Sequence, residues 1–402
     1  MSGLLPVDDA LSRILADATP LPHESVPIDR AHGRILAEPL AAKLTQPPFD
    51  ASAMDGYAVR AADAARIPVT LTVVGEAAAG HPFSGRVEAG QTVRIFTGAP
   101  VPAGADAIVI QENTERSGTR VVVKASAARS DHVRSRGFDF SAGSSLLQPG
   151  RKLGARELSL AAAMGHGSVA VYRRPRVAVL STGDELVPPG ETPGPGQIVS
   201  SNHLGVGALA ELAGADVIQL GIARDTRESL ETHVERASGA DLLITIGGAS
   251  VGDHDLVAPT LQRRGMQLAF WKIAMRPGKP LMFGRLGPLR FVGLPGNPVS
   301  ALVCTRVFVT PLLRRLSGLP DAAAATLTAR AAVPIEANGP RQHYMRATLN
   351  RTPGGTLEVT PVRSQDSSLL SPLAIADCLI VRAPNTPPLS PGDSVEILPL
   401  DF

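Results

Sequence analysis

The sequence predicts a multidomain protein in which a parallel-sheet α/β domain is joined to helical and β-rich segments. The chain has 402 residues, and at about 150 residues per domain this length corresponds to two or three domains. Strand-like and helix-like runs alternate between residues 175 and 317, as expected of a parallel sheet covered by helices. Short β-like runs separated by Gly, Pro and Asn fill residues 57–135 and the chain from about residue 322.

The N-terminal segment, up to about residue 40, is predicted to be helical. Val7, Leu11 and Ile14 fall on one face of such a helix, with two acids in its first turn. A second short helix is expected over Asp29–Leu36. A loop broken by Pro47 and the proline after it follows.

The next segment is predicted to form a small, mostly antiparallel β unit. Its strand candidates are Val69–Val74, Gln91–Ile95, Ala107–Ile110 and Thr119–Lys124. Helical periodicity returns at Ala155–Met164 and ends at a glycine.

The α/β region carries the clearest periodicity. Strands are predicted at Arg176–Leu180, Asp216–Ile222 and Leu242–Ile246, with helices at Asn202–Ala213 and Thr226–Ser238. In such a sheet the binding site is expected at the carboxyl ends of the strands.

The C-terminal region is predicted to be a small β-barrel or sandwich. Its strand candidates are Leu327–Val333, Met345–Leu349, Leu357–Pro361, Cys378–Val381 and Val395–Leu398.

Composition argues against several classes of protein. A formal net charge of +2 and 3% aromatic residues do not favour nucleic-acid binding. The two cysteines, Cys304 and Cys378, form no zinc-ribbon or disulfide pattern. No apolar run approaches the roughly 18 residues of a membrane span, and the N-terminus lacks the pattern of a secretory signal. A soluble protein of a reducing compartment is expected.

Polar, flexible residues follow the predicted strands of the α/β region. The segments are Ser181–Glu185, Arg224-Asp225 and Gly247–Asp255. Glycines there would let backbone N–H groups approach phosphate oxygens. The acids Asp184, Glu185, Asp225 and Asp255 would meet at one sheet edge, and carboxylates beside phosphates are typical of Mg²⁺ sites. The alternative is that each acid caps a helix.

Two further segments would suit an anion. Lys272, Arg276 and Lys279 lie within eight residues, and in an extended chain Lys272 and Arg276 project to the same side. Asn297 and Pro298 fit the N-cap and first position of a long apolar helix, whose start presents free N–H groups. A solvated basic loop and an ordinary capped helix are the alternatives.

Two acids lie in unusual loops outside the α/β region. Asp55 belongs to the small-residue loop Ser52–Ala58, and Asp139 ends the run Arg134–Asp139. Taken alone, each loop is adequately explained by a structural role.

Together these residues resemble the molybdopterin molybdenumtransferase family, which includes MoeA and the E domain of gephyrin. Seven segments carry the resemblance, in the family's order: PPFDASAMDGYAV at 47–59, RIFTGAPVPAGADAIV at 94–109, RSRGFDFSAG at 134–143, STGDEL at 181–186, GGASVGDHD at 247–255, RPGKP at 276–280 and GLPGNPVSA at 293–301.

The resemblance implies a cytoplasmic homodimer whose subunit has four domains. These would be a discontinuous helical linker and dimerisation domain (1–44 and 141–174), a β-rich lever domain inserted at 45–140, a MogA-like α/β molybdopterin-binding domain at 175–321 and a C-terminal β-barrel at 322–402. It also implies molybdenum cofactor biosynthesis: molybdenum from molybdate enters adenylylated molybdopterin, with Mg²⁺-assisted release of AMP. The implied partners are a molybdopterin adenylyltransferase and molybdoenzyme chaperones or apoenzymes, with no nucleic acid and no membrane.

The resemblance also assigns residues. Asp55 and Asp139 would reach an α/β-domain site across the dimer, so that the active site is shared between subunits. The family often has Lys at the position of Arg276, where this chain keeps the charge on a planar guanidinium. The implied catalytic residues are Asp55, Asp139, Glu185, Asp225, Lys272 and Lys279; the metal ligands are Glu185, Asp225 and Asp255; the substrate-binding residues are Thr182, Gly183, Gly247, Gly248, Ser250, Gly252, Arg276, Pro295, Gly296, Asn297 and Pro298.

A non-catalytic molybdopterin-binding scaffold of the same fold is the alternative, since gephyrin also serves as a receptor scaffold. A degenerate scaffold is expected to lose several of the five acids Asp55, Asp139, Glu185, Asp225 and Asp255. All five are present, which favours the enzyme.

Overall fold

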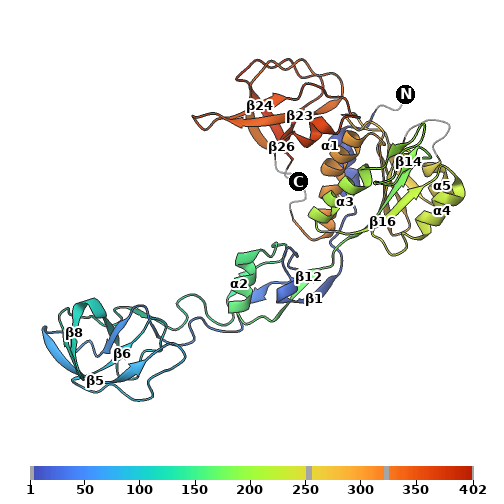
Figure 1. Ribbon diagram of the computed structural model, residues 1–402. Coiled ribbons are helices and arrows are strands. Elements are labelled where there is room, and N and C mark those ends of the chain that lie inside the picture. The colour runs from blue at the N-terminus through green and yellow to red at the C-terminus, as the bar shows by residue number, and fades with distance from the viewer. Residues whose placement is uncertain (1–3, 250–255, 321–325, 401–402) are drawn as a thin grey trace. The chain divides into compact units, whose positions relative to one another are not determined.

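The computed structural model describes residues 4–249, 256–320 and 326–400 (Figure 1). The chain divides into two compact units. Unit 1 comprises Met1–Glu24, Gly33–Ala37 and Ala170–Phe402, and unit 2 comprises Ser25–His32 and Glu38–Val169. None of the helices in the described ranges is long and apolar enough to cross a membrane.

Unit 1 contains the predicted α/β domain, built on a six-stranded sheet. Its order is β16-β13-β17-β21-β20-β18. The first four strands pair in parallel, and β20 pairs antiparallel with both β21 and β18. The strands are β13 (Arg176–Thr182), β16 (Asp216–Ala223), β17 (Leu242–Ile246), β18 (Gln267–Trp271), β20 (Met282–Leu286) and β21 (Leu289–Leu294). The predicted strand–helix alternation is confirmed, and an antiparallel pair extends the sheet at one edge.

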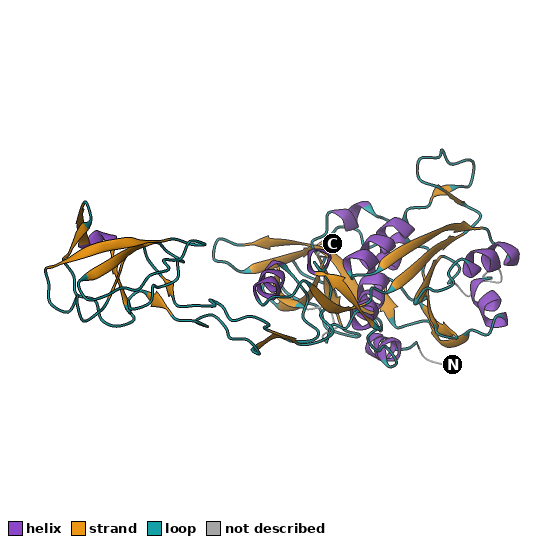
Figure 2. Ribbon diagram, turned by 90° about the horizontal axis from the view of Figure 1, so that it is seen from below, coloured by secondary structure: helices purple, strands orange, loops and turns teal. Residues whose placement is uncertain are grey.

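Both faces of this sheet are buried, which explains the continuous apolar runs in β13 and β17. Because side chains alternate along a strand, Val177 and Val179 belong to one apolar cluster and Ala178 and Leu180 to the other. Helices cover both faces (Figure 2). They are α1 (Val7–Leu15), α3 (Asn202–Leu212), α4 (Arg227–Glu235), α5 (Val257–Arg263), α6 (Pro298–Cys304) and α7 (Thr310–Leu316).

Two helix predictions need correction. The helix expected over Asp29–Leu36 is wrong: a single 3-10 turn (Ile28–Arg30) is present. Gly33 follows with φ +75, a conformation outside the right-handed helix. The long helix expected after residue 298 is interrupted by a π-helical stretch, Thr305–Val309. Pro311 lies one turn later, and its ring would collide with the carbonyl four residues before it in a regular α-helix.

The C-terminal part of unit 1 is a closed barrel, as predicted. The sheet order is β19-β23-β24-β22-β26-β25, and β25 pairs back onto β23. The strands are β19 (Met275–Arg276), β22 (Leu327–Ala331), β23 (Gln342–Arg351), β24 (Leu357–Pro361), β25 (Cys378–Arg382) and β26 (Ser394–Pro399), with the short helix α8 (Ser371–Ala374). β19 comes from the α/β domain, and Arg276 pairs with His343 in the barrel.

Unit 2 is built on a mostly antiparallel six-stranded sheet of order β7-β4-β6-β5-β9-β8, in which the β5–β6 pair is parallel. Two smaller ladders join β3 to β10 and β2 to β11. The elements are β2 (Leu40–Ala41), β3 (Ala51–Ser52), β4 (Gly56–Val59), β5 (Val69–Ala77), β6 (Gln91–Ile95), β7 (Ala107–Ile110), β8 (Thr114–Ser117), β9 (Arg120–Val123), β10 (Val133–Arg134), β11 (Ser145–Leu147), a 3-10 turn (Gln111–Asn113) and α2 (Ala155–Ala163). Four short strands form two further ladders. β1 (His23–Pro27) pairs with β12 (Ser168–Tyr172), and in unit 1 β14 (Leu186–Val187) pairs with β15 (Ile198–Val199).

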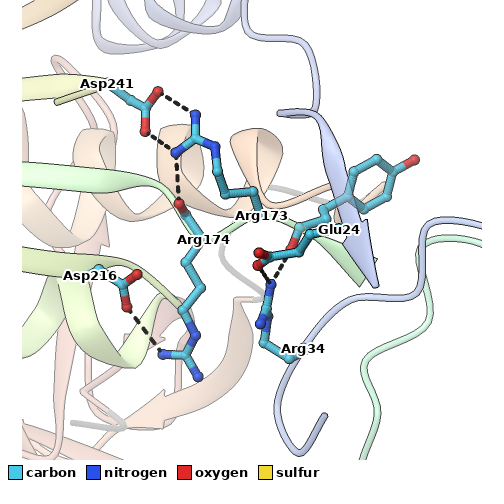
Figure 3. Close-up of polar contacts among 7 residues, drawn as sticks. Glu24, Arg34, Arg173, Arg174, Asp216 and Asp241 are labelled. Atoms are coloured by element: carbon cyan, nitrogen blue, oxygen red, sulfur yellow. Dashed lines mark hydrogen bonds and ion pairs between the residues drawn. The ribbon is translucent and has the colours of Figure 1, made fainter. Parts of the chain in front are cut away.

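Ion pairs in unit 1 fix the chain just before β13, at the amino-terminal ends of the parallel strands (Figure 3). Arg173 donates two hydrogen bonds of 2.9 Å to Asp241. Burial opposes ionisation of Asp241, but the bonds from Arg173 and from the amide of Arg176 outweigh it and lower the pKa of the carboxyl. Arg34 pairs with Glu24 and donates to a neighbouring carbonyl. These ion pairs stabilise the fold of unit 1.

Candidate functional site

The carboxyl ends of β13, β17 and β21 lie close together at one end of the α/β sheet. Gly247, with φ +95, lies so close to Thr182 that an added Cβ would fall 2.6 Å from the Thr182 carbonyl oxygen. An added Cβ on Gly296 would lie 3.8 Å from the Cα of Gly247. The amide of Gly247 donates to the Leu294 carbonyl at 3.1 Å. Only glycine permits this approach at residue 247, so the edge is lined by backbone, which suits a phosphate group.

The Thr182 hydroxyl adds an unused polar group at this edge. Thr182 is 4% exposed, and its Oγ1 has no hydrogen-bond partner among the described residues. A buried polar atom left without a partner is costly. A bound ligand or water would satisfy it.

Acidic side chains lie at the ends of the two neighbouring strands β13 and β16. Asp184 accepts a hydrogen bond of 3.2 Å from the amide of Asp225. The carboxylate of Glu185 lies over Gly183, where an added Cβ would fall 2.3 Å from Glu185 Oε2. All three acids are exposed. The predicted Asp255, together with Ser250 and Gly252, falls outside the described residues.

These acids are candidate ligands for a metal ion. In the described ranges, no group of three or more His, Cys, Asp or Glu side chains is close enough to hold a metal ion. Mg²⁺ needs fewer, because it is commonly held by one or two carboxylates together with substrate phosphates and waters. Glu185 and Asp225 are exposed carboxylates at the ends of two neighbouring strands, and they have the oxygen donors that such an ion takes.

The loop after β17 is held by Trp271. Its indole N–H donates to the Ala249 carbonyl at 3.0 Å, which fixes the end of the segment that carries Gly247 and Gly248. The neighbouring Lys272 has φ +77, and its Nζ lies 6.0 Å from the Trp271 ring centroid. The chain is therefore not extended at Lys272, contrary to expectation, and Lys272 is absent from the cavity that Arg276 and Lys279 line.

That cavity, of about 530 Å³, lies between the α/β domain and the barrel of unit 1. Its cationic residues are Arg276, Lys279 and Arg341. The other lining residues are Pro277, Gly278, Pro280, Pro295, Gly296, Asn297, Ser300, Gln365, Asp366 and Ser367. Guanidinium, ammonium and hydroxyl donors around one space suit a small oxyanion.

Asn297 occupies the expected position before α6, but its side chain makes no capping hydrogen bond. Its Nδ2 donates instead to Ser367 Oγ at 2.8 Å. The Ser367 carbonyl accepts from the amide of Val299 at 3.1 Å. A loop of the barrel thus takes over part of the capping of α6 and closes one side of the cavity.

Arg341 and Ser367 were not predicted from the sequence. Both lie in the barrel, where nothing in the local residue pattern indicates an anion site. They reach the cavity because β19 pairs with β23. The one available signal, a segment of the α/β region that would pair with the C-terminal domain, is too short to recognise in a sequence.

His343 lies buried on β23 beside this cavity. Burial, reinforced by four neighbouring guanidiniums, lowers its pKa from 6.5 to about 4. The guanidiniums belong to Arg276, Arg341, Arg346 and Arg382. The imidazole is therefore neutral at pH 7.

This depressed pKa predicts a loss of stability in mild acid. Between pH 6.5 and about 4 the unfolded chain binds a proton at His343 that the folded chain does not, so stability falls as pH falls. We expect about 2 kcal/mol, or roughly 2–3 °C in Tm, measured by calorimetry across this range. His203, whose pKa burial also lowers from 6.5, contributes to the same slope. In His343→Gln the slope should therefore become shallower, and an unchanged slope would show that His343 is not its source.

The two acids predicted outside the α/β region lie in unit 2. Asp55 Oδ1 accepts hydrogen bonds of 2.8 Å from both the amide and the hydroxyl of Thr97. These bonds, with the charge of Arg94, lower the pKa of the carboxyl. Asp139 is exposed beside Phe138, whose side chain is 70% exposed. Asp55 itself is half-buried.

Comparison with known proteins gives consistent matches along the chain. Residues 5–165 match the MoeA N-terminal region (domain I and II), residues 178–315 a probable molybdopterin binding domain, and residues 328–400 the MoeA C-terminal region (domain IV). A molybdopterin molybdenumtransferase of Haemophilus influenzae is 37% identical, with 99% of each chain covered. One from a Nostoc species is 38% identical, covering 94% of this chain and 88% of the relative. A crystal structure of a molybdopterin biosynthesis MoeA protein from Pyrococcus superposes with a TM-score of 0.85 at 31% identity, covering all of both chains.

Proposed function

Because the chain belongs to the MoeA family of molybdopterin molybdenumtransferases, we propose that it inserts molybdenum from molybdate into adenylylated molybdopterin and releases AMP. It is a transferase of molybdenum cofactor biosynthesis. The proposal concerns the substrates, the metal and the residues that act.

The observation that carries the proposal is the cavity between the α/β domain and the barrel. It gathers Arg276, Lys279 and Arg341 around about 530 Å³, and one wall includes Gly296, which lies against the glycine-lined strand ends. Molybdate is a tetrahedral dianion, so it suits the cationic cavity. The pterin and its phosphates suit the backbone edge formed at Gly183, Gly247 and Gly296. The dianion and the pterin would then occupy neighbouring parts of one site.

Mg²⁺ belongs to the same proposal. Glu185 and Asp225 would hold it, together with phosphate oxygens of the substrate and Asp255. When bound, it would neutralise charge on the phosphoanhydride as the leaving AMP separates. Lys279 would add positive charge near this bond from the adjoining cavity. Lys272, which does not line that cavity, would act from its place beside Trp271, which holds the loop after β17.

The proposed assembly is a cytoplasmic homodimer with an active site shared between subunits, in which Asp55 and Asp139 act on the site of the partner. Support comes from an apolar stripe on α3, where Leu204 and Leu212 are 53% and 62% exposed and share a face with the exposed Ala208. The four-domain division, with boundaries near residues 44, 140, 174 and 321, and the adenylyltransferase and molybdoenzyme partners belong to the same proposal.

The direct experiment incubates the purified protein with adenylylated molybdopterin, molybdate and Mg²⁺. AMP release and dithiolene-bound molybdenum are measured together. Molybdate-dependent AMP release with stoichiometric metal transfer is the expected result. Tight binding of the nucleotide-pterin without AMP release would contradict it and favour a molybdopterin-binding protein that does not catalyse this step.

Lys279→Gln should weaken molybdate binding. A charge-assisted hydrogen bond contributes roughly 1.5–3 kcal/mol, so the KM for molybdate should rise about 10- to 100-fold. The KM for adenylylated molybdopterin should change much less. Lys152→Gln, at an exposed lysine of unit 2, is the control and should behave as the parent. A parent-like molybdate saturation curve for Lys279→Gln would remove this residue from the anion site.

A further inference from the structure

The barrel side of the anion cavity is held by a buried arginine that does not line it. Arg346 lies on β23 and is 1% exposed. Its guanidinium donates to the carbonyl oxygens of Ser364 at 3.0 Å, Asp366 at 2.9 Å and Leu369 at 2.9 Å. Burying a guanidinium is unfavourable unless its donors are used. Here three carbonyls of one loop, residues 364–369, use them.

The same loop is also fixed through the backbone of Arg346. The Gln365 side chain accepts from the Arg346 amide and donates to the Arg346 carbonyl, both at 2.9 Å. Side chain and backbone of one residue therefore set the conformation of the whole loop.

This arrangement determines where the loop amides point. In a trans peptide the N–H lies opposite the C=O. Since the carbonyls of Ser364 and Asp366 face Arg346, the amides of Gln365 and Ser367 face away from it. Neither amide donates to another described group, and both residues line the cavity. The amide of Asp366 between them donates to Ser364 Oγ at 3.4 Å, so the loop offers the cavity two amide donors, those of Gln365 and Ser367.

The loop is tied on its other side to the α/β domain. Ser367 Oγ accepts from Asn297 at 2.8 Å, and the Ser367 carbonyl accepts from the amide of Val299. Arg346 thus lies behind the loop and the start of α6 lies across from it. A shift of the loop would displace the hydroxyl and amide of Ser367 from the cavity and release Asn297.

We propose that Arg346 is a positioning residue for the molybdate site, which it completes by holding the loop of residues 364–369 with its amides toward the cavity. The proposal rests on the proposed function, because it takes the cavity to be the molybdate site. It adds that the affinity for the anion depends on a side chain that never touches the anion.

The test compares Arg346→Lys with Arg382→Lys. A lysine keeps the charge but has a single ammonium in place of the planar fork, so it cannot hold three carbonyls spread over residues 364–369. Arg382 is the matched control: it is 3% exposed on the neighbouring strand β25 and bonds to Thr386 and Pro387, outside the loop. Both variants should lose thermal stability. Only Arg346→Lys should raise the KM and the Kd for molybdate, by about tenfold or more.

Molybdate affinity is measured in two ways: equilibrium dialysis with molybdate alone, and AMP release at saturating adenylylated molybdopterin. In Arg346→Lys the KM for adenylylated molybdopterin should stay within about twofold of the parent. A folded Arg346→Lys with parent-like molybdate affinity would overturn the proposal, as would an equal loss in Arg382→Lys.

Two further results keep the outcomes separate. If Arg346→Lys does not fold, Gln365→Ala decides in its place, since it removes the two side-chain bonds to the Arg346 backbone and leaves the buried charge. It should raise the molybdate Kd, and an unchanged Kd would overturn the inference. If the parent protein itself neither binds molybdate nor releases AMP with it, the proposed function fails, irrespective of the variants.

Discussion

Glu185→Gln is expected to reduce AMP release by at least about 100-fold while the fold is retained. The carboxylate lies at the carboxyl end of β13, directly over Gly183, and is exposed. Glu185 contributes to the fold through its backbone, because its carbonyl oxygen accepts a hydrogen bond from the amide of Ile198 at 2.8 Å. An amide side chain of the same size removes the charge and keeps that contact. The kcat for AMP release and the stoichiometry of bound molybdenum are the measurements.

Glu191→Gln provides the control, because Glu191 is an exposed acid a few residues further along the same segment. It should retain parent activity. Titration with Mg²⁺ then separates two roles for Glu185. A metal ligand is expected to leave an enzyme whose residual activity needs more Mg²⁺, whereas an acid or base leaves the Mg²⁺ requirement unchanged. Full turnover by Glu185→Gln at parent Mg²⁺ concentration would exclude both roles.

The sheet of the α/β domain was predictable because its strands are buried on both faces. Arg176–Leu180 and Leu242–Ile246 read as continuous apolar runs with helical periodicity between them. Each residue's environment there follows from its near neighbours in sequence. The same reasoning failed over Asp29–Leu36. A helix was predicted there although the segment contains Gly33. The positive φ of this glycine is incompatible with a continuing right-handed helix.

The acids and glycines of the strand ends were also predictable, since the ends of parallel strands meet at one edge. The cavity beside them was not. Arg276 and Lys279 were identified as anion binders from their spacing, but Arg341, Ser367 and the buried Arg346 lie more than 60 residues later in the chain. Their place depends on the pairing of β19 with β23 and on hydrogen bonds to backbone carbonyls, which any residue provides and no sequence pattern marks.

Asp55→Asn is expected to match Glu185→Gln, with a loss of at least about 100-fold in AMP release. Its Oδ1 already accepts two hydrogen bonds from Thr97, which hold the carboxylate in one orientation and favour its charged form. Both bonds go to one oxygen, which the side-chain carbonyl of Asn can replace as an acceptor, so the loop around Thr97 should persist. Glu112→Gln, at an exposed acid of the same unit, is the control. Parent-like kcat in Asp55→Asn would remove this acid from the chemistry.

The pair of variants also tests whether the site is shared between subunits. Asp55 belongs to unit 2 and Glu185 to unit 1. If each site combines unit 1 of one chain with unit 2 of its partner, a heterodimer of Asp55→Asn and Glu185→Gln chains has one doubly altered site and one intact site. Purified through two different affinity tags, it should show about half the parent activity, although each homodimer is inactive. If each site is built within one chain, every site carries one substitution and the heterodimer stays inactive. Recovered activity therefore requires a dimer in which the acids of one chain serve the strand ends of the other.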